Sequence, residues 1–269
     1  AREGSETKIL VRSQKEATYL NSQRENTRFL PGVKIPENAI ATESLDNAFD
    51  KSEIILFAVP SHSLRQNAQT VANKIDHEAI VVSAVKGLEV GSGKRMSEIL
   101  AEELPNTDKK NICALSGPNL AMEIVKGKPS STVIASSDIE VCTKAQKLLN
   151  SKQLRIYTND DIIGVEIGGA LKNITAIAVG ISDGLQFGDN AKAAIITRGL
   201  AEIARLGESL GAKKSTFSGL AGMGDLIATC SSSLSRNNQV GRMLASGQSI
   251  QDIHKTMKNV AEGVKTTEA

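Results

Sequence analysis

The segment from Gly164 to Gly180 combines one lysine, Lys172, with several glycines in a stretch that is predicted to be helical. Each glycine inside a helix costs about 0.5–1 kcal/mol relative to alanine, so repeated glycines indicate a local requirement. The residues that share the helix face of Lys172 are all small: Gly168, Gly169, Thr175 and Ala176. We therefore expect space for a ligand beside this lysine, whose ammonium would donate a proton or bind an anion. The alternative is close helix packing, with the lysine extending to solvent.

A second candidate site lies between Gly219 and Asn238. Ser235, Arg236 and Asn237 stand where a short helix is predicted to begin. The free N–H groups at a helix start attract an anion, and a guanidinium can bind it through two hydrogen bonds. The pattern therefore predicts a phosphate site, although a plain serine cap beside a solvated arginine would look the same. The preceding run Gly219–Gly224 has the order G-x-x-G-x-G and no strand before it, so it is not a dinucleotide-binding loop.

Three predicted strands end in small polar residues. Ligands of open parallel sheets bind beyond the carboxyl ends of the strands. Each turn alone is ordinary, but three on one sheet edge, one of them carrying the cation Lys86, favour a ligand crevice. The strands and their turns are Ile54–Val59 with Pro60-Ser61-His62, Ala79–Ala84 with Val85-Lys86-Gly87-Leu88-Glu89, and Ile112–Leu115 with Ser116-Gly117-Pro118-Asn119-Leu120-Ala121.

The first half of the chain alternates strands with helices, which predicts an α/β domain with a doubly wound parallel sheet of the Rossmann type. The strands are short, rich in Val and Ile and mostly without polar alternation, as strands covered on both faces are. The remaining predicted strands are Lys8–Arg12, Thr132–Ala135 and Leu154–Tyr157, and the predicted helices are His62–Ile75, Met96–Leu104 and Ser137–Asn150, the last capped by Ser137.

The second half contains no strand-like run after about Asp160. Long helices are predicted over Gly164–Ile181 and Ala191–Leu210, with shorter ones starting near Asp225 and Arg236. We therefore expect a dinucleotide-binding domain over residues 1–160, followed by an all-α substrate domain over residues 161–269.

Composition excludes several classes of partner. The 269 residues carry 32 basic and 30 acidic side chains, and this balance gives no reason to expect nucleic acid or an anionic membrane. No Trp and only seven Phe and Tyr residues offer little for base stacking. No apolar run approaches the roughly 18 residues of a membrane span. Three scattered cysteines favour a reducing, cytoplasmic compartment, and three scattered histidines predict no metal site.

Both ends of the sequence are interpreted as truncated. The chain opens on what reads as the last turn of a helix capped by Gly4, and it stops at Ala269, where another helix could be starting. If Lys8–Arg12 is the second strand of a dinucleotide fold, the first strand, its G-x-G-x-x-G loop and its helix would precede Ala1. Arg12 then ends the strand where an arginine would meet the 2′-phosphate of NADP.

Taken together, these segments resemble the NAD(P)-dependent glycerol-3-phosphate dehydrogenases of the bacterial type. The resembling segments occur in the family's order and cover nearly the whole chain, but they lack the family's first βα unit and its last helices. They are Asn26–Pro31, Ala58–Ser61, Lys86–Glu89, Ser116–Asn119, Asp160–Glu166, Leu171–Gly184, Gly219–Cys230, Ser235–Asn237 and Glu262–Val264.

The resemblance implies an oxidoreductase that interconverts dihydroxyacetone phosphate and sn-glycerol 3-phosphate with NADPH or NADH, NADPH being favoured by Arg12. It implies a cytoplasmic enzyme, with a homodimer as one option, that supplies glycerol 3-phosphate for phospholipid synthesis. Its substrate is a small molecule.

The resemblance also assigns roles to matching residues. Lys172 matches the catalytic lysine, the proton acceptor when glycerol 3-phosphate is oxidised. Lys86 and Arg236 match contacts to both substrate and cofactor. The other matching substrate contacts are Gly117, Asn119 (often Ser or Thr in the family), Asp225, Ser235 and Asn237, and the other matching cofactor contacts are Ala121, Val260 and Glu262.

Two other functions remain open at this point. A dehydrogenase of the 3-hydroxyacid type also places a lysine on a glycine-bearing helix, but it would bind a carboxylate and would not need Ser235-Arg236-Asn237 to grip phosphate. A non-catalytic NADP-binding sensor would keep the fold without the chemistry.

Overall fold

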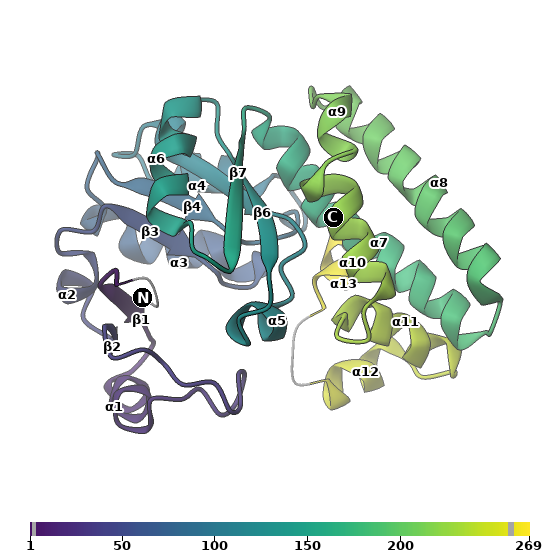
Figure 1. Cartoon of the computed structure of the whole chain (residues 1–269), viewed down its shortest axis with the longest axis horizontal. Coiled ribbons are helices and arrows are strands. Elements are labelled where there is room, and N and C mark those ends of the chain that lie inside the picture. The colour runs from purple at the N-terminus through teal and green to yellow at the C-terminus, as the bar shows by residue number, and fades with distance from the viewer. Residues whose placement is uncertain (2–3, 258–260) are drawn as a thin grey trace.

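A five-stranded sheet forms the centre of the first half of the chain in the computed structural model, which describes residues 1, 4–257 and 261–269 (Figure 1). Its strands follow one another in chain order: β3 (Ile54–Phe57), β4 (Ile80–Ser83), β5 (Ile112–Ser116), β6 (Ser130–Ala135) and β7 (Leu154–Asn159). The pairings β3–β4, β4–β5 and β6–β7 are parallel, as predicted. The pairing β5–β6 is antiparallel, because the connection holds only the short helix α5 (Ala121–Val125), which cannot return the chain along the sheet.

A separate pair of parallel strands, β1 (Thr7–Leu10) and β2 (Ala39–Thr42), lies at the beginning of the chain, next to α1 (Gln14–Gln23) and α2 (Leu45–Phe49). The predicted strand Lys8–Arg12 starts one residue late and ends two residues late, since Arg12 lies beyond β1, next to Ser13, which caps α1. Strand β2 was not predicted, because its Ala-Ile-Ala-Thr sequence is only four residues long and half of it is alanine, which is depleted in strands.

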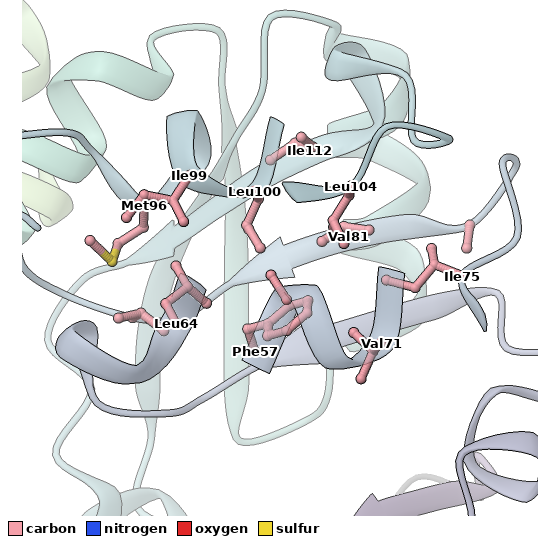
Figure 2. Close-up of a cluster of buried hydrophobic side chains, with 13 residues drawn as sticks. Phe57, Leu64, Val71, Ile75, Val81, Met96, Ile99, Leu100, Leu104 and Ile112 are labelled. Carbon is pink, nitrogen blue, oxygen red and sulfur yellow. The ribbon is translucent and has the colours of Figure 1, made fainter. Parts of the chain in front are cut away.

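Helices cover both faces of the five-stranded sheet. On one face, α3 (Leu64–Val71) and α4 (Met96–Glu103) pack on Phe57 and Val81 (Figure 2). On the other face, α6 (Ile139–Leu149) packs on Ile80, Val82 and Cys113. Alternate residues of β4 thus face different cores, which explains its apolar run Ile80–Val82 and confirms the doubly wound, Rossmann-like fold.

Two local predictions in this half need correction. The predicted helix His62–Ile75 is divided into a 3-10 turn η1 (Ser61–Ser63), α3, and a second 3-10 turn η2 (Ala72–Lys74). The cap of α6 is Asp138, whose carboxylate accepts a hydrogen bond from the Glu140 N–H at 2.8 Å, rather than Ser137. A further 3-10 turn, η3 (Lys109–Asn111), precedes β5.

The second half of the chain, as far as the structure describes it, contains only helices. They are α7 (Ile162–Gly184), α8 (Gly188–Ser209), α9 (Lys214–Phe217), the π-helical turn η4 (Leu220–Gly224), α10 (Asp225–Ser231), α11 (Arg236–Ala245), α12 (Ile250–Thr256) and α13 (Glu262–Glu268). Figure 1 shows α8, α10 and α11 gathered around α7, with α7 adjoining the sheet. The run Gly219–Gly224 therefore lies in a helical region, as predicted.

Helix α7 is long and apolar enough to cross a membrane by length and hydropathy. The expectation that no apolar stretch approaches that length is therefore wrong for this helix. Within the protein, 67% of its most apolar 18-residue window is buried. Its apolar character follows from its place at the centre of the helical unit, where α8, α10, α11 and α13 all pack against it.

Helices α7 and α11 touch backbone to backbone. A Cβ atom added at Gly180 of α7 would lie 2.1 Å from the Asn238 carbonyl oxygen, and one added at Gly241 of α11 would lie 2.1 Å from the Ile177 carbonyl oxygen. Only glycine allows this approach, so these residues set the separation of the two helices.

Candidate active site

The side chain of Asp225 joins two lysines where the sheet meets the helices. Lys172 comes from the middle of α7, Asp225 opens α10, and Lys86 follows β4. Lys172 Nζ pairs with Asp225 Oδ1, while Lys86 Nζ donates to Asp225 Oδ2 at 2.7 Å and to the Gly117 carbonyl at 2.8 Å. One carboxylate, only 1% exposed, therefore binds an ammonium group at each of its oxygens. The second cation reaches the site from the end of its strand, as expected.

The small residues around Lys172 are covered by protein. A Cβ atom at Gly168 would lie 2.7 Å from the Ala221 carbonyl oxygen, and one at Gly169 would lie 2.4 Å from Ser116 Oγ. The expectation that these glycines leave room for a ligand is therefore wrong. The space beside them is occupied by η4 and by the end of β5. Lys172 does not extend to solvent either, since it is buried and donates to Thr229 Oγ1 at 2.7 Å.

Burial and charge change the protonation of Lys172. Desolvation and, after it, the nearby Lys86 cation lower the pKa of its ammonium to about 7, although Asp225 opposes both effects. The lysine is therefore poised to give or take a proton near neutral pH, which is what general acid–base catalysis requires.

The turn after β5 carries Gly117 and Asn119. Gly117 has φ +153°, and a Cβ there would lie 3.0 Å from Thr132 Cα, so only glycine fits. Asn119 donates to Thr132 Oγ1 at 2.9 Å, while its own buried Oδ1 accepts no hydrogen bond in the described part of the chain. A buried acceptor without a donor is costly, so it fits a ligand that brings an N–H or O–H group.

The start of α11 has the predicted form of an anion site. Ser235 caps the helix and accepts from the Asn238 N–H at 3.3 Å, as expected. Arg236 is exposed, and its guanidinium makes no hydrogen bond or ion pair with any residue that the structure describes. Asn237 is buried and donates to Asn173 Oδ1 at 2.8 Å. Because Asn173 adjoins Lys172 on α7, the helix start is tied to the lysine site.

The remaining predicted residues lie around this site or away from it. Glu262 at the start of α13 accepts from Ser61 N at 3.2 Å and from Ser61 Oγ at 2.5 Å, which links the end of the described chain to the turn after β3. Ala121 opens α5 and is exposed. Arg12 is exposed beyond β1, and no contact in the described residues ties it to the lysine site. Val260 lies outside the described residues.

Two residues of the site, Thr229 and Asn173, were not identified from the sequence. Thr229 stands four residues after Asp225, so both share a face of α10, and that spacing could have identified it. Asn173 was hidden by its position beside Lys172, since neighbouring helix residues point in different directions. Among residues 1, 4–257 and 261–269, no three His, Cys, Asp or Glu side chains form a potential metal site.

A Rossmann-like sheet with polar residues beyond the carboxyl ends of its strands is typical of dinucleotide-binding proteins. Family comparison agrees: residues 1–142 match the N-terminal model of NAD-dependent glycerol-3-phosphate dehydrogenase, and residues 161–269 match its C-terminal model. The chain belongs to the NAD-dependent glycerol-3-phosphate dehydrogenase family.

Individual relatives support the same assignment. A glycerol-3-phosphate dehydrogenase [NAD(P)+] of Dehalococcoides mccartyi is 52% identical over 99% of this chain and 75% of its own length. The corresponding protein of Lysinibacillus sphaericus is 45% identical over 100% of this chain and 80% of its own length. The crystal structure of the glycerol-3-phosphate dehydrogenase of Coxiella burnetii is 34% identical, with a TM-score of 0.93 over 99% of this chain and 81% of that one. The predicted family, the enzyme class and the nicotinamide cofactor, NADH or NADPH, are thus confirmed.

Proposed function

We propose that the protein interconverts dihydroxyacetone phosphate and sn-glycerol 3-phosphate by hydride transfer with NADPH or NADH. The observation that carries this proposal is the Asp225 carboxylate, which holds Lys172 and Lys86 together where the sheet meets α7. Reduction of a ketone places negative charge on the carbonyl oxygen, and two convergent ammonium groups are suited to stabilise it.

Lys172 acts as the acid–base residue in this proposal. As an ammonium it delivers a proton to the carbonyl oxygen of dihydroxyacetone phosphate, and as a free amine it accepts one from the hydroxyl of glycerol 3-phosphate. Asp225 holds the ammonium in place, and Thr229 fixes its direction. Lys86 contributes a second positive charge to the same oxygen and contacts the cofactor.

The start of α11 binds the substrate phosphate in this proposal. Ser235, Arg236 and Asn237 present a helix N-terminus and a guanidinium without a partner in the described part of the chain, both of which favour a dianion. The phosphate does not react, so the energy of binding it serves to position the ketone beside Lys172. Gly117 and Asn119 complete the substrate contacts from the turn after β5.

The chain's own residues fit a nicotinamide cofactor. Asn119 Oδ1, which has no partner among the described residues, offers an acceptor where β5 ends, and this suits a group with amide N–H donors. Lys86, Ala121, Arg236, Val260 and Glu262 would hold the cofactor, and Arg12 would meet a 2′-phosphate. When bound, the reduced cofactor supplies the hydride from C4 of its nicotinamide ring.

The proposal extends to the organisation and setting of the protein. Residues 1–160 form the dinucleotide-binding domain and residues 161–269 the substrate domain, the change falling between β7 and α7. The enzyme works in the cytoplasm, where glycerol 3-phosphate feeds phospholipid synthesis. Sedimentation of the purified protein tests whether it is a homodimer.

The deciding experiment follows the absorbance of NADPH and NADH with three substrates: dihydroxyacetone phosphate, unphosphorylated dihydroxyacetone and a 3-oxo acid. Oxidation of the cofactor that depends on dihydroxyacetone phosphate supports the proposal. A preference for the 3-oxo acid would favour the 3-hydroxyacid type of dehydrogenase. Cofactor binding without turnover of any ketone would favour a sensor.

A further inference from the structure

The loop that carries Lys86 is folded back on itself and anchored at its far end. It starts after β4 and ends at Arg95, where α4 begins. Leu88 and Arg95 form an antiparallel bridge, and the Glu89 N–H donates to the Lys94 carbonyl at 3.0 Å. The two ends of the loop therefore lie together, so a displacement at Arg95 is transmitted to the residues next to Lys86.

Glu166 of α7 binds this far end. Its Oε2 accepts from Arg95 Nη1 at 2.7 Å and from Ser97 Oγ at 2.6 Å, and its Oε1 accepts from the Ser97 N–H at 2.7 Å. The Glu166 side chain is only 6% exposed. Burying a carboxylate this deeply destabilises the fold unless the group is fully paired. Here both oxygens of Glu166 accept hydrogen bonds from the loop end and the first turn of α4, and Arg95 balances the charge.

The same side of α7 also contacts the near end of the loop. Gly169, one turn after Glu166, lies against the Lys86 stem, since a Cβ there would be 3.7 Å from Lys86 Cγ. Leu88 packs into the cluster that contains Ile167 and Leu171 of α7. Helix α7 therefore contacts both ends of the loop that carries Lys86. The same helix carries Lys172, so α7 determines the distance between the two ammonium groups.

We propose that Glu166 is a positioning residue that keeps Lys86 beside Lys172 by fixing the Arg95 end of the loop. Glu166 touches neither lysine. It acts through Arg95 and Ser97, and it makes α7 the common support for both cations. This inference rests on the proposed function for its kinetic consequence, but its structural consequence, the distance between the two ammonium groups, can be measured without turnover.

Glu166→Gln tests the proposal, because it keeps the shape of the side chain while removing its charge and one acceptor. We expect kcat for dihydroxyacetone phosphate to fall on the order of tenfold, with a smaller change in KM, since displacing a catalytic group by a fraction of an ångström has effects of this size. With lysine labelled at 13Cε, NMR titration should show the pKa of Lys172 rising toward its ordinary value as Lys86 moves away. The other charged group at that ammonium, Asp225, is unchanged in this variant. The Lys172 signal is assigned as the resonance that is absent from the spectrum of the Lys172→Met variant.

Asp161→Asn is the matched control. Asp161 is also buried, caps the same helix, and accepts from Gly164 N at 2.8 Å, Lys213 N at 2.8 Å and Thr216 Oγ1 at 2.6 Å, none of them in the Lys86 loop. We expect it to lower the melting temperature while the Lys172 titration stays at its wild-type position. If Glu166→Gln leaves both kcat and that titration unchanged, or if Asp161→Asn moves the titration equally, the proposal is overturned.

Ser97→Ala keeps the experiment decisive if Glu166→Gln does not fold, because it removes only the hydroxyl from the cluster. It should shift the titration in the same direction by less, and no shift would overturn the proposal. If the wild-type protein fails to reduce dihydroxyacetone phosphate, the proposed function fails, whereas the NMR titration still decides the role of Glu166.

Discussion

Lys172 and Asp225 lie on different helices, α7 and α10, yet their side chains pair where both are almost fully buried, 7% and 1% exposed. A buried ion pair must recover the cost of desolvating both charges. Here desolvation disfavours the charged form of Lys172, and so does Lys86, which binds the same carboxylate. The ion pair therefore contributes little to the stability of the fold, but its surroundings give Lys172 a pKa near neutrality.

Lys172→Met should lower kcat for ketone reduction by roughly 10²- to 10⁴-fold, the usual value of positioned proton transfer. Methionine keeps an unbranched stem that suits a helix, and Asp225 keeps Lys86 as partner. NADPH affinity and melting temperature should therefore change little. Stopped-flow kinetics, a binding titration and calorimetry check the three expectations. A variant with near-wild-type kcat would transfer the catalytic role to Lys86.

The two directions of the reaction should respond oppositely to pH. Lys172 carries its proton below a pKa of about 7 and lacks it above. In kcat/KM, which reports the free enzyme, reduction should therefore fall as pH rises through about 7, whereas oxidation should rise. The bound phosphate dianion favours the ammonium, so the corresponding change in kcat should lie at higher pH. Profiles that move in the same direction would rule out Lys172 as the group responsible.

Asp225→Asn should lower the pKa of Lys172 further, because Asp225 is the group that raises it. The variant leaves two ammonium groups close together without a counter-charge, so reduction at neutral pH should lose its proton donor. We expect the fall of kcat/KM for reduction with rising pH to move to lower pH. Thr229→Val removes a neutral contact of Lys172 and serves as the control, with a much smaller displacement.

Arg236→Ala should raise KM for dihydroxyacetone phosphate about 10- to 100-fold, the equivalent of one charged hydrogen bond of roughly 1.5–3 kcal/mol. The exposed guanidinium has no partner among the described residues, so the melting temperature should not change. Arg198→Ala, at another exposed arginine on α8, controls for loss of a surface charge. An equal loss with unphosphorylated dihydroxyacetone would show that Arg236 does not bind the phosphate.

Arg12→Ala should reduce kcat/KM for NADPH more than for NADH, if Arg12 meets the 2′-phosphate beyond the end of β1. Because Arg12 is exposed and unpaired in the described part of the chain, a change in the cofactor ratio would not reflect misfolding. An unchanged ratio would remove Arg12 from cofactor selection.

The sequence predicted the convergence of Lys86 and Lys172 because strand ends and helix periodicity are local patterns with known geometry. It did not predict what fills the space beside Gly168 and Gly169, since small residues permit both a ligand and a neighbouring backbone. Nor could it predict the direction of β6, because a short apolar strand has the same composition in either orientation. Asp225 was assigned to the site, but its simultaneous binding of both lysines depends on tertiary distances.

The backbone contact between α7 and α11 fixes the distance between these two helices. Side-chain packing can yield by a rotamer, but the carbonyl of Asn238 seated against Gly180 cannot. In the proposed function, that contact sets the span from the proton-transferring lysine on α7 to the phosphate grip that opens α11. In that function, the fixed separation of the two helices would favour ketones in which the distance from carbonyl to phosphate matches it.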